Sequence, residues 1–342
     1  MKYTYKKTGV NIDAATEALR KSKKYIKATF NKNTATDVGS FGGVYKFDKN
    51  RFLVASTDGV GTKIKIAQKT DIHHTVGQDI VNHCVNDILV MGAKPLMFLD
   101  YIGVGKLSPD VIAGIIKGLS KACVENKTVL IGGETAEMPG VYKPGEYDIA
   151  GTIIGEVRKG CVITGKRIKK GDVVIGLGSS GLHTNGYSLA RKVFESRRIK
   201  YTSKPKGLKE KLGKTLLKPH KSYFRSVYPL LKNNYKAVHA MAHITGGGFY
   251  DNIARILPKG VNCVINKKAW KPLSIFKLIQ EKGKVDDKEM YRVFNMGIGL
   301  VMVVDKKKAN NIIKFLKKKK QKAIKIGEIT KGNKKVIVGN GL

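Results

Sequence analysis

An acidic residue and a glycine-hinged turn follow a short apolar run near position 55, and together they could hold a nucleotide phosphate. The run leads into Asp58, and Gly59, Gly61, Thr62 and Lys63 follow. Glycine has no Cβ, so the backbone there can approach a ligand closely. A hydroxyl, an ammonium and free backbone N–H groups would converge beside a carboxylate able to bind Mg²⁺. The spacing is not that of a P-loop, and taken alone the stretch fits an ordinary strand-end turn equally well.

A predicted helix over residues 77–91 carries a second set of polar groups. Its apolar residues recur at helical spacing on one side. The opposite side consists of Asp79, Asn82, His83, Asn86 and Asp87. That side has no lysine in a very basic chain, which indicates a wall for a metal or a substrate. A buried hydrogen-bond network is the alternative, and His83 by itself is more typical of a structural hydrogen bond than of a metal ligand.

The stretch GGETAEMPG, residues 132–140, follows a predicted strand at 128–131. Glu134 and Glu137 are three residues apart in it, and we interpret the stretch as a turn at the strand end. Two carboxylates in such a place could hold phosphate-bound Mg²⁺ or an amine.

Two glycine-rich connections from strand to helix follow in the second half. The first, GSSGLHTNGYS at residues 178–188, has Thr184 and Asn185 near the start of a helix and His183 at its mouth. The second is HITGGG at residues 243–248. Backbone N–H groups at a helix start bind anions. Two such loops in one domain favour an anionic ligand over packing as their cause.

The charge of the chain raises the question of nucleic acid. Lys+Arg is 65 against Asp+Glu 26, a formal net charge of +39. A nucleic-acid-binding protein would concentrate its basic and aromatic residues on a recognition element. Here the motif-bearing stretches contain no Lys or Arg: 52–62, 77–93, 128–142, 171–190, 237–254 and 293–305. We therefore predict a solvated, lysine-rich surface and no nucleic-acid partner.

Cysteine spacing and hydropathy indicate the cellular compartment of the protein. Cys84, Cys123, Cys161 and Cys263 are far apart, with no CxxC pair and no signal peptide. Disulfides and a zinc site based on cysteine are not expected, so we predict a reducing, cytoplasmic location. The chain has no apolar run long enough to cross a bilayer, so no membrane partner is expected.

Predicted helices and strands alternate along the chain and position these motifs. The lysine-rich stretch at 158–170 divides them, so we predict two domains, at residues 1–165 and 166–342. The predicted strands include residues 94–104, 148–157, 172–177, 261–265, 298–304 and 323–329. The predicted helices include residues 109–124, 220–231 and 274–281.

Five motifs in this order resemble one enzyme family: STDGVGTK, GQDIVNHCVNDILVMGAKP, GGETAEMPG, GLHTNGYS and HITGGG. The chain is similar over nearly its whole length to phosphoribosylformylglycinamidine cyclo-ligase, the aminoimidazole ribonucleotide synthetase of purine biosynthesis. The resemblance implies a two-domain α+β protein that forms a homodimer. Its N-terminal sheet domains would pair across the dimer, and helices of its C-terminal domain would pack on one sheet. ATP and substrate would lie in the cleft between the domains.

The resemblance also implies the reaction, ATP-dependent closure of formylglycinamidine ribonucleotide to aminoimidazole ribonucleotide with release of ADP and phosphate. It implies Mg²⁺ on Asp58, Asp87 and Glu134, and proton transfer by His183 or His243 with Asp87. The implied ATP-binding residues are Asp58, Gly59, Gly61, Thr62, Lys63, Asp79 and Asn86. The implied substrate-binding residues are Glu137, Asn185, Gly186, Gly246, Gly247 and Gly248. The alternative within the superfamily is another ATP user, such as selenophosphate synthetase or thiamine-phosphate kinase.

Overall fold

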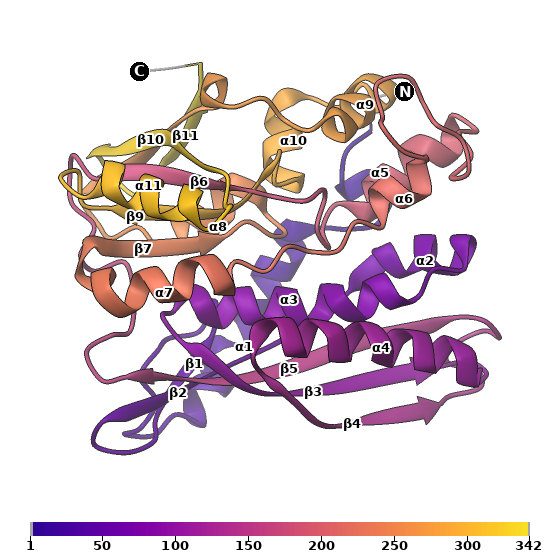
Figure 1. Cartoon of the computed structure of the whole chain (residues 1–342), viewed down its shortest axis with the longest axis horizontal. Coiled ribbons are helices and arrows are strands. Elements are labelled where there is room, and N and C mark those ends of the chain that lie inside the picture. Colours follow the sequence, from indigo (N-terminus) through magenta and orange to yellow (C-terminus); the bar gives the residue numbers. More distant parts are fainter. Residues whose placement is uncertain (1–2, 341–342) are drawn as a thin grey trace.

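Two β-sheets separated by helices form the molecule in the computed structural model, which describes residues 3–340 (Figure 1). The extreme ends of the two predicted domains, residues 1–2 and 341–342, lie outside the described residues. Residues 43–158 build the first sheet and residues 173–339 build the second.

The N-terminal sheet has five strands in the order β1-β2-β5-β3-β4. Their bounds are β1 Gly43–Lys46, β2 Arg51–Gly59, β3 Lys94–Val104, β4 Val129–Glu137 and β5 Tyr147–Arg158. β3 and β4 are parallel and all other neighbours are antiparallel. A parallel pair needs a crossover, and helix α4, Pro109–Asn126, supplies it. Because β4 is last in the strand order, it is an edge strand.

The C-terminal sheet has six strands in the order β11-β8-β10-β6-β9-β7. Their bounds are β6 Val173–Gly178, β7 Val238–His243, β8 Val261–Asn266, β9 Ile298–Val304, β10 Ala323–Lys331 and β11 Val336–Gly339. β8 and β11 are parallel and the other pairs are antiparallel. β6, β7 and β9 are buried along their whole length, and the continuous apolar runs of β6 and β9 suggest this.

The helices connect and cover these strands. Those before the second sheet are α1 Ile12–Ala28, α2 Ile64–Thr70, α3 His74–Val90 and α4 Pro109–Asn126. Those within the second domain are α5 Tyr187–Ser196, α6 Leu212–Leu216, α7 Phe224–Asn234, α8 Gly248–Ala254, α9 Ser274–Gly283, α10 Asp287–Val293 and α11 Ala309–Lys318. No helix in residues 3–340 combines the length and apolarity that a membrane crossing requires.

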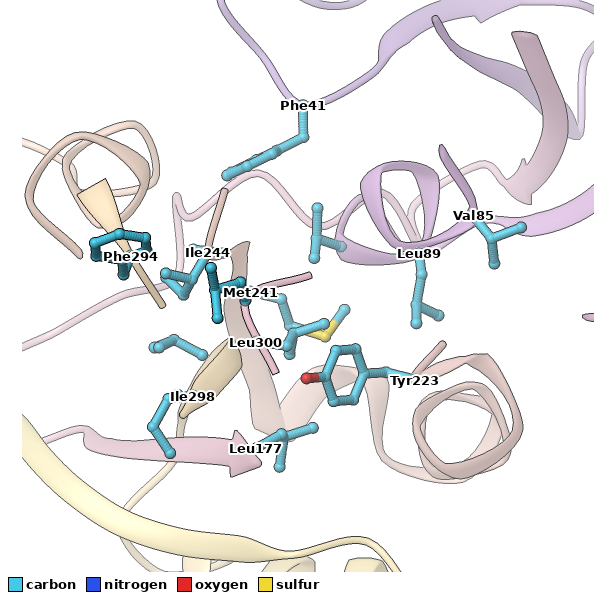
Figure 2. Packing of buried hydrophobic residues seen from close by; sticks show 14 of the residues in the cluster. Phe41, Val85, Leu89, Leu177, Tyr223, Met241, Ile244, Phe294, Ile298 and Leu300 are labelled. Atoms are coloured by element: carbon cyan, nitrogen blue, oxygen red, sulfur yellow. The ribbon is translucent and has the colours of Figure 1, made fainter. Parts of the chain in front are cut away.

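Helix α3 lies between the two domains (Figure 1). Every residue from Thr75 to Val90 is buried, so neither side of the helix faces solvent. Its apolar side packs on β2 and β5, and its other side meets β7 and α7. Figure 2 shows Val85 and Leu89 of α3 with Tyr223 and Met241 of the second domain in one apolar cluster. The core is therefore continuous across the domain junction.

Two elements differ from the sequence prediction. β4 continues through GGETAE to Glu137, so Glu134 lies inside an edge strand and not on a turn. Parallel pairing with β3, up to Val104 opposite Glu137, extends the strand. The second difference is that α7 begins at Phe224, four residues after the predicted start at His220. The backbone of residues 220–223 forms hydrogen bonds with side chains of α3 instead of continuing the helix.

Candidate active site between the two domains

The polar side of α3 binds the backbone of residues 220–223. Asp79 Oδ1 accepts the N–H of His220 at 2.6 Å, and Asn82 Nδ2 donates to the carbonyl of the same residue at 2.7 Å. Asn86 Nδ2 donates to Lys221 O at 2.9 Å, and its Oδ1 accepts the N–H of Tyr223 at 3.0 Å. In a helix these backbone N–H and C=O groups would bond to one another. Because they bond to side chains of α3 instead, α7 starts after the predicted position. The lysine-free face is thus a buried hydrogen-bond network at the domain junction.

Lys63 and Asp79 form a fully buried ion pair beside this loop, with Nζ and Oδ2 2.8 Å apart. Lys63 Nζ also donates to Lys218 O at 2.8 Å. Burial lowers the pKa of Lys63 and raises that of Asp79, and the contact between the two opposes both shifts. Lys63 and Asp79, like Asn86, were predicted to bind ATP. In the structure all three side chains are committed to holding the two domains together.

Four of the seven histidines in the chain meet at this junction: His83, His183, His220 and His243. The Nε2 atoms of His220 and His243 face each other at 2.9 Å. The rings of His183 and His220 stack with centroids 3.9 Å apart. All four side chains are at most 4% exposed, and burial lowers the pKa values of His183, His220 and His243. Burial therefore favours the uncharged form of these three rings.

Two predicted carboxylates complete the cluster around His83. His83 Nε2 lies 2.8 Å from Asp58 Oδ2 and 3.7 Å from Asp87 Oδ2, and Asp87 Oδ1 accepts the Nδ1–H of His243 at 2.8 Å. Burial alone would raise the pKa of Asp58, but the neighbouring charge and hydrogen bond of His83 hold it at about 2. Asp58 is 41% exposed at its side chain and Asp87 is 8% exposed. The structure thus places Asp58, Asp87 and His243 around His83, and their metal-binding and catalytic roles stay predictions.

His83 should make stability depend on alkaline pH. Burial favours its neutral form, but Asp58 and the other adjacent carboxylates outweigh this and raise its pKa to about 9. Because the folded pKa lies above the unfolded value of 6.5, the stabilisation is complete below about pH 6.5 and is lost as pH rises through about 9. We expect the free energy of unfolding to fall on the order of 3 kcal/mol across that window. Urea titrations at several pH values would measure it, and a fall of the same size in His83→Gln would contradict the assignment to His83.

His183 occupies a confined position that a glycine makes possible. Its backbone is in the left-handed region at φ 63°, and its Nε2 is within 3.4 and 3.5 Å of the N–H groups of Ser180 and Lys221. A Cβ at Gly299 would lie 2.3 Å from both the His183 ring and the Tyr223 hydroxyl. Gly299 therefore leaves the space in which His183 stacks on His220. A glycine inside the apolar strand 298–304 was the sequence signal for this close approach.

The glycine loops reach the surface next to the cluster. Asn185 Oδ1 lies 3.3 Å from the place that a Cβ at Gly246 would take, so the two loops meet there. Asn252 Nδ2 donates to the carbonyls of Thr245, Gly246 and Gly248 and thereby shapes the second loop. Gly186, Gly247 and Gly248 adopt positive φ, which accounts for glycine at these positions without a ligand.

Thr62 connects the first turn to this region. Its hydroxyl lies 3.1 Å from the hydroxyl of Ser188, at the start of α5. Gly59 is half-buried, and Gly61 and Thr62 are exposed. The predicted phosphate-binding turn and the GLHTNGYS loop therefore lie side by side at the mouth of the domain junction.

Glu134 and Glu137 lie apart from the other site residues within one chain. Asp58 and Glu134 lie on the first and last of four adjacent strands. Asp58 of β2 pairs with Gly151 of β5, which pairs with Asp100 of β3, and Asp100 pairs with Gly133 of β4, the neighbour of Glu134. Three strand spacings amount to about 14 Å, so Glu134 cannot share a metal with Asp58 and Asp87 in the same chain. Glu137 Oε1 instead accepts the N–H of Leu107 at 2.8 Å. A metal-binding role of Glu134 stays a prediction that would need ligands other than these two aspartates of the same chain.

Sequence reasoning missed His220, which contacts more of the cluster than any predicted histidine. It lies in the lysine-rich stretch LKPHKSY and belongs to no glycine-rich motif. Thr184 was noted only for its place near a helix start, yet its Oγ1 is 2.7 Å from His83 Nδ1 and 3.4 Å from His220 Nδ1. A histidine in a segment otherwise made of surface residue types was the only available signal for His220.

Comparisons with known proteins identify the family. Residues 39–157 match the family model "AIR synthase related protein, N-terminal domain", and residues 169–340 match the corresponding C-terminal domain. A phosphoribosylformylglycinamidine cyclo-ligase from Pseudothermotoga lettingae is 48% identical over 341 residues, covering 99% of this chain and 100% of the relative. The chain belongs to the phosphoribosylformylglycinamidine cyclo-ligase family. A cyclo-ligase from Alkaliphilus metalliredigens is 44% identical over 342 residues, 98% of each chain.

Solved structures of other enzymes share the fold of this cyclo-ligase. AaThiL in complex with AMPPCP and TMP superposes with a TM-score of 0.68 at 17% identity, covering 97% of this chain and 96% of the other. Thiamine-monophosphate kinase from Stenotrophomonas maltophilia gives a TM-score of 0.63 at 16% identity, with 95% and 96% covered. Identities this low show a common two-domain α+β fold and do not transfer the kinase activity.

Proposed function

We propose that this ligase closes the imidazole ring of formylglycinamidine ribonucleotide, using ATP and forming aminoimidazole ribonucleotide, ADP and phosphate. ATP would phosphorylate the formamide oxygen, which is otherwise a poor leaving group. An amidine nitrogen then forms the new C–N bond, the C–O bond to phosphate breaks, and one proton is released. Full-length relatives named for this activity support the reaction over the kinase alternative.

The observation that carries the proposal is the meeting of Asp87 with His243 at the domain junction. The two residues are 156 positions apart, come from the two motif sets, and are joined by a 2.8 Å hydrogen bond. Because Asp87 accepts the Nδ1–H of His243, the Nε2 atom carries the lone pair of the neutral ring. His183 Nε2 instead points to two backbone N–H groups. We therefore assign the proton released on ring closure to His243 Nε2 and give His183 a binding role.

ATP use is supported by relatives of the fold, because AaThiL was solved with the ATP analogue AMPPCP. For Mg²⁺, Asp58 and Asp87 fit, since hard carboxylate oxygens converge near the mouth of the junction and Mg²⁺ usually takes one or two carboxylates plus phosphate oxygens. Bound there, the cation would neutralise phosphate charge. Gly59, Gly61, Thr62, Asn185 and Gly246 are proposed to contact the phosphates.

The function is tested by one incubation with formylglycinamidine ribonucleotide, ATP and Mg²⁺. We expect aminoimidazole ribonucleotide and ADP to form in equal amounts, and neither to form when the ribonucleotide is left out. ADP formation that does not depend on this substrate would contradict the assignment and favour another ATP-dependent enzyme with the same fold. Thiamine phosphate, supplied in place of the ribonucleotide, is the matched negative control.

The proposal includes a homodimer formed through the N-terminal sheet. Large apolar side chains are exposed on β3 and β4: Leu99, Tyr101, Val129 and Ile131. Within residues 3–340, β4 also has one edge without a partner strand. An apolar surface at an open strand edge favours pairing with a second copy. Such pairing would also give Glu134 and Glu137 a second chain to contact.

Ile131→Lys should weaken this dimer. Ile131 is 59% exposed, so a lysine there is tolerated in the free chain but would place a charge in a buried apolar interface. We expect light scattering to give the mass of a dimer for the unmodified chain and of a monomer for the variant. Ile337→Lys is the matched control, because Ile337 is 45% exposed on the other sheet. Equal masses for the two variants would contradict the proposed interface.

The proposed partners are small molecules, and the proposed location is the cytoplasm. All four cysteines are free thiols, three of them buried. The charge of +39 is proposed to be incidental to function. Duplex DNA binding that survives physiological salt would contradict this, since complexes held by phosphate contacts weaken steeply with salt.

A further inference from the structure

His243 Nε2, the nitrogen assigned the proton of ring closure, is closed off from a bound substrate. His243 is 0% exposed, and its Nε2 lies 2.9 Å from Nε2 of His220, which is 1% exposed. Asp87 accepts the Nδ1–H of His243 at 2.8 Å, which leaves the lone pair of His243 on Nε2. The hydrogen between the two Nε2 atoms therefore belongs to His220. A proton that reaches His243 at this nitrogen has to come from His220.

The other nitrogen of His220 continues the hydrogen bonds toward the first glycine-rich loop. With its hydrogen on Nε2, His220 has an acceptor at Nδ1, and Thr184 Oγ1 lies 3.4 Å from it. Since protonated His83 carries a hydrogen on both ring nitrogens, its Nδ1 can donate to the same oxygen at 2.7 Å and leave the hydroxyl hydrogen for His220. Catalytic hydrogen bonds are often long in a free enzyme and tighten when the substrate binds.

The ring of His220 is held so that either of its nitrogens can carry the hydrogen. It stacks on the ring of His183, with centroids 3.9 Å apart and planes 23° apart. Asn86 Nδ2 lies 3.2 Å from His220 Nε2 and can donate to that nitrogen once it has given up its hydrogen. Both neutral forms of the ring therefore have hydrogen-bond partners, which allows the ring to receive a proton at Nδ1 and release one at Nε2.

Thr184 is the member of this hydrogen-bonded series that lies nearest the surface. It is 7% exposed, against 1% for His220 and 0% for His243. The next residue, Asn185, is half-buried and meets Gly246 where the two glycine-rich loops approach each other. Because Asn185 and Gly246 are proposed to contact the phosphates, a substrate bound there would lie beside the Thr184 hydroxyl.

We propose that Thr184 and His220 relay the proton of ring closure to His243, an inference that rests on the proposed function. The N–H bond of the reacting amidine nitrogen breaks and a bond to Thr184 Oγ1 forms. In the same step the hydroxyl proton moves to His220 Nδ1, and the Nε2 proton of His220 moves to His243. Thr184 and His220 end neutral, and the positive charge ends on His243. The carboxylate of Asp87 lies beside that charge, and the reverse path returns the proton to water after product release.

Thr184→Val and Thr184→Ser test the catalytic contact, because valine lacks the hydroxyl and serine keeps it. Loss of a positioned proton-transfer group costs about 100- to 10,000-fold, so Thr184→Val should lower kcat at least about 100-fold and leave KM nearly unchanged. Thr184→Ser should keep most of kcat. Thr128→Val is the matched control, because Thr128 is also buried and its hydroxyl has no hydrogen-bond partner within residues 3–340. It should leave kcat unchanged.

His220 acts through Thr184 and is a positioning residue, so its test needs a measurement that separates proton relay from packing. His220→Ala should lose kcat by a factor similar to that of Thr184→Val, and added imidazole should restore part of the turnover. Pyrrole fills the same space but has no second nitrogen to accept a proton, so it should restore none. Equal recovery with the two compounds, or full turnover in Thr184→Val, would overturn the relay.

The starting hydrogen-bond arrangement can be measured without turnover. In the unmodified chain with isotope-labelled histidine ring nitrogens, nuclear magnetic resonance should show coupling between the Nε2 nuclei of His220 and His243, with the hydrogen on His220. A His220 ring protonated only at Nδ1 would refute the relay, even if the variants fail to fold. If the unmodified chain makes no aminoimidazole product, the proposed function fails, and the labelled spectrum still decides whether the hydrogen-bonded series exists.

Discussion

Replacing Asp87 by asparagine is expected to lower kcat at least about 100-fold while the chain still folds. The side chain keeps its size, and the amide oxygen can still accept the Nδ1–H of His243. What is lost is the negative charge that stabilises a protonated His243 and, in the proposal, binds Mg²⁺. A positioned proton-transfer group contributes about 100- to 10,000-fold to a rate, and metal stabilisation of charge adds several kcal/mol. Steady-state turnover at saturating ATP and Mg²⁺ measures the effect.

Asp172→Asn is the matched control for this prediction. Asp172 is also a buried aspartate paired with a histidine, since its Oδ2 lies 2.7 Å from His239 Nδ1. It belongs to the second domain and contacts no member of the histidine cluster. Its amide variant should lose stability but keep turnover within a few-fold. Equal losses of turnover in the two folded variants would show that Asp87 acts through stability and not through chemistry.

The largest effect on stability is expected for Asp79→Asn. The change leaves the Lys63 ammonium buried without its counter-ion, at a site where both side chains are 0% exposed. Breaking a buried pair by removing one partner costs about 3–5 kcal/mol, because the remaining charge is not solvated. The hydrogen bonds of Asp79 to His220 N–H and of Lys63 to Lys218 O should weaken with it. The urea midpoint of the variant, compared with that of the unmodified chain, measures the loss.

Glu146→Gln provides the comparison for an exposed pair. Lys65 Nζ and Glu146 Oε1 are 2.6 Å apart, but the side chains are 35% and 38% exposed. Exposed ion pairs contribute about 0–1 kcal/mol, because solvent screens the charges and ordering the side chains costs entropy. If Asp79→Asn lowered the midpoint no more than Glu146→Gln does, the buried pair would not be what holds the domains together.

Elements with a strong local pattern could be predicted from the sequence. The strands expected at 94–104 and 298–304 are observed at Lys94–Val104 and Ile298–Val304. The apolar runs of these two strands lie between glycine, proline and charged residues. A pattern of this kind depends only on residues that are neighbours in the sequence, so it can be found without the tertiary structure. The motifs around Asp58, Asp87, His183 and His243 marked candidate site residues because the family resemblance carried that information, and their roles stay predictions.

The tertiary structure alone decided which polar groups pair across the domain junction. His220 is 134 residues from Asn86 and 23 from His243, and no local spacing in its lysine-rich segment records either contact. Its backbone is bound by α3, which ends the helical pattern that the sequence predicted there. Similarly, β4 continues to Glu137 because β3 pairs with it, and Glu134 lies three strand spacings, about 14 Å, from Asp58. Sequence by itself determined the family and the strands with strong periodicity, whereas the roles of the candidate site residues stay predictions. Packing of one domain against the other determined which of them touch, since a buried polar group must find its partner wherever the fold supplies one.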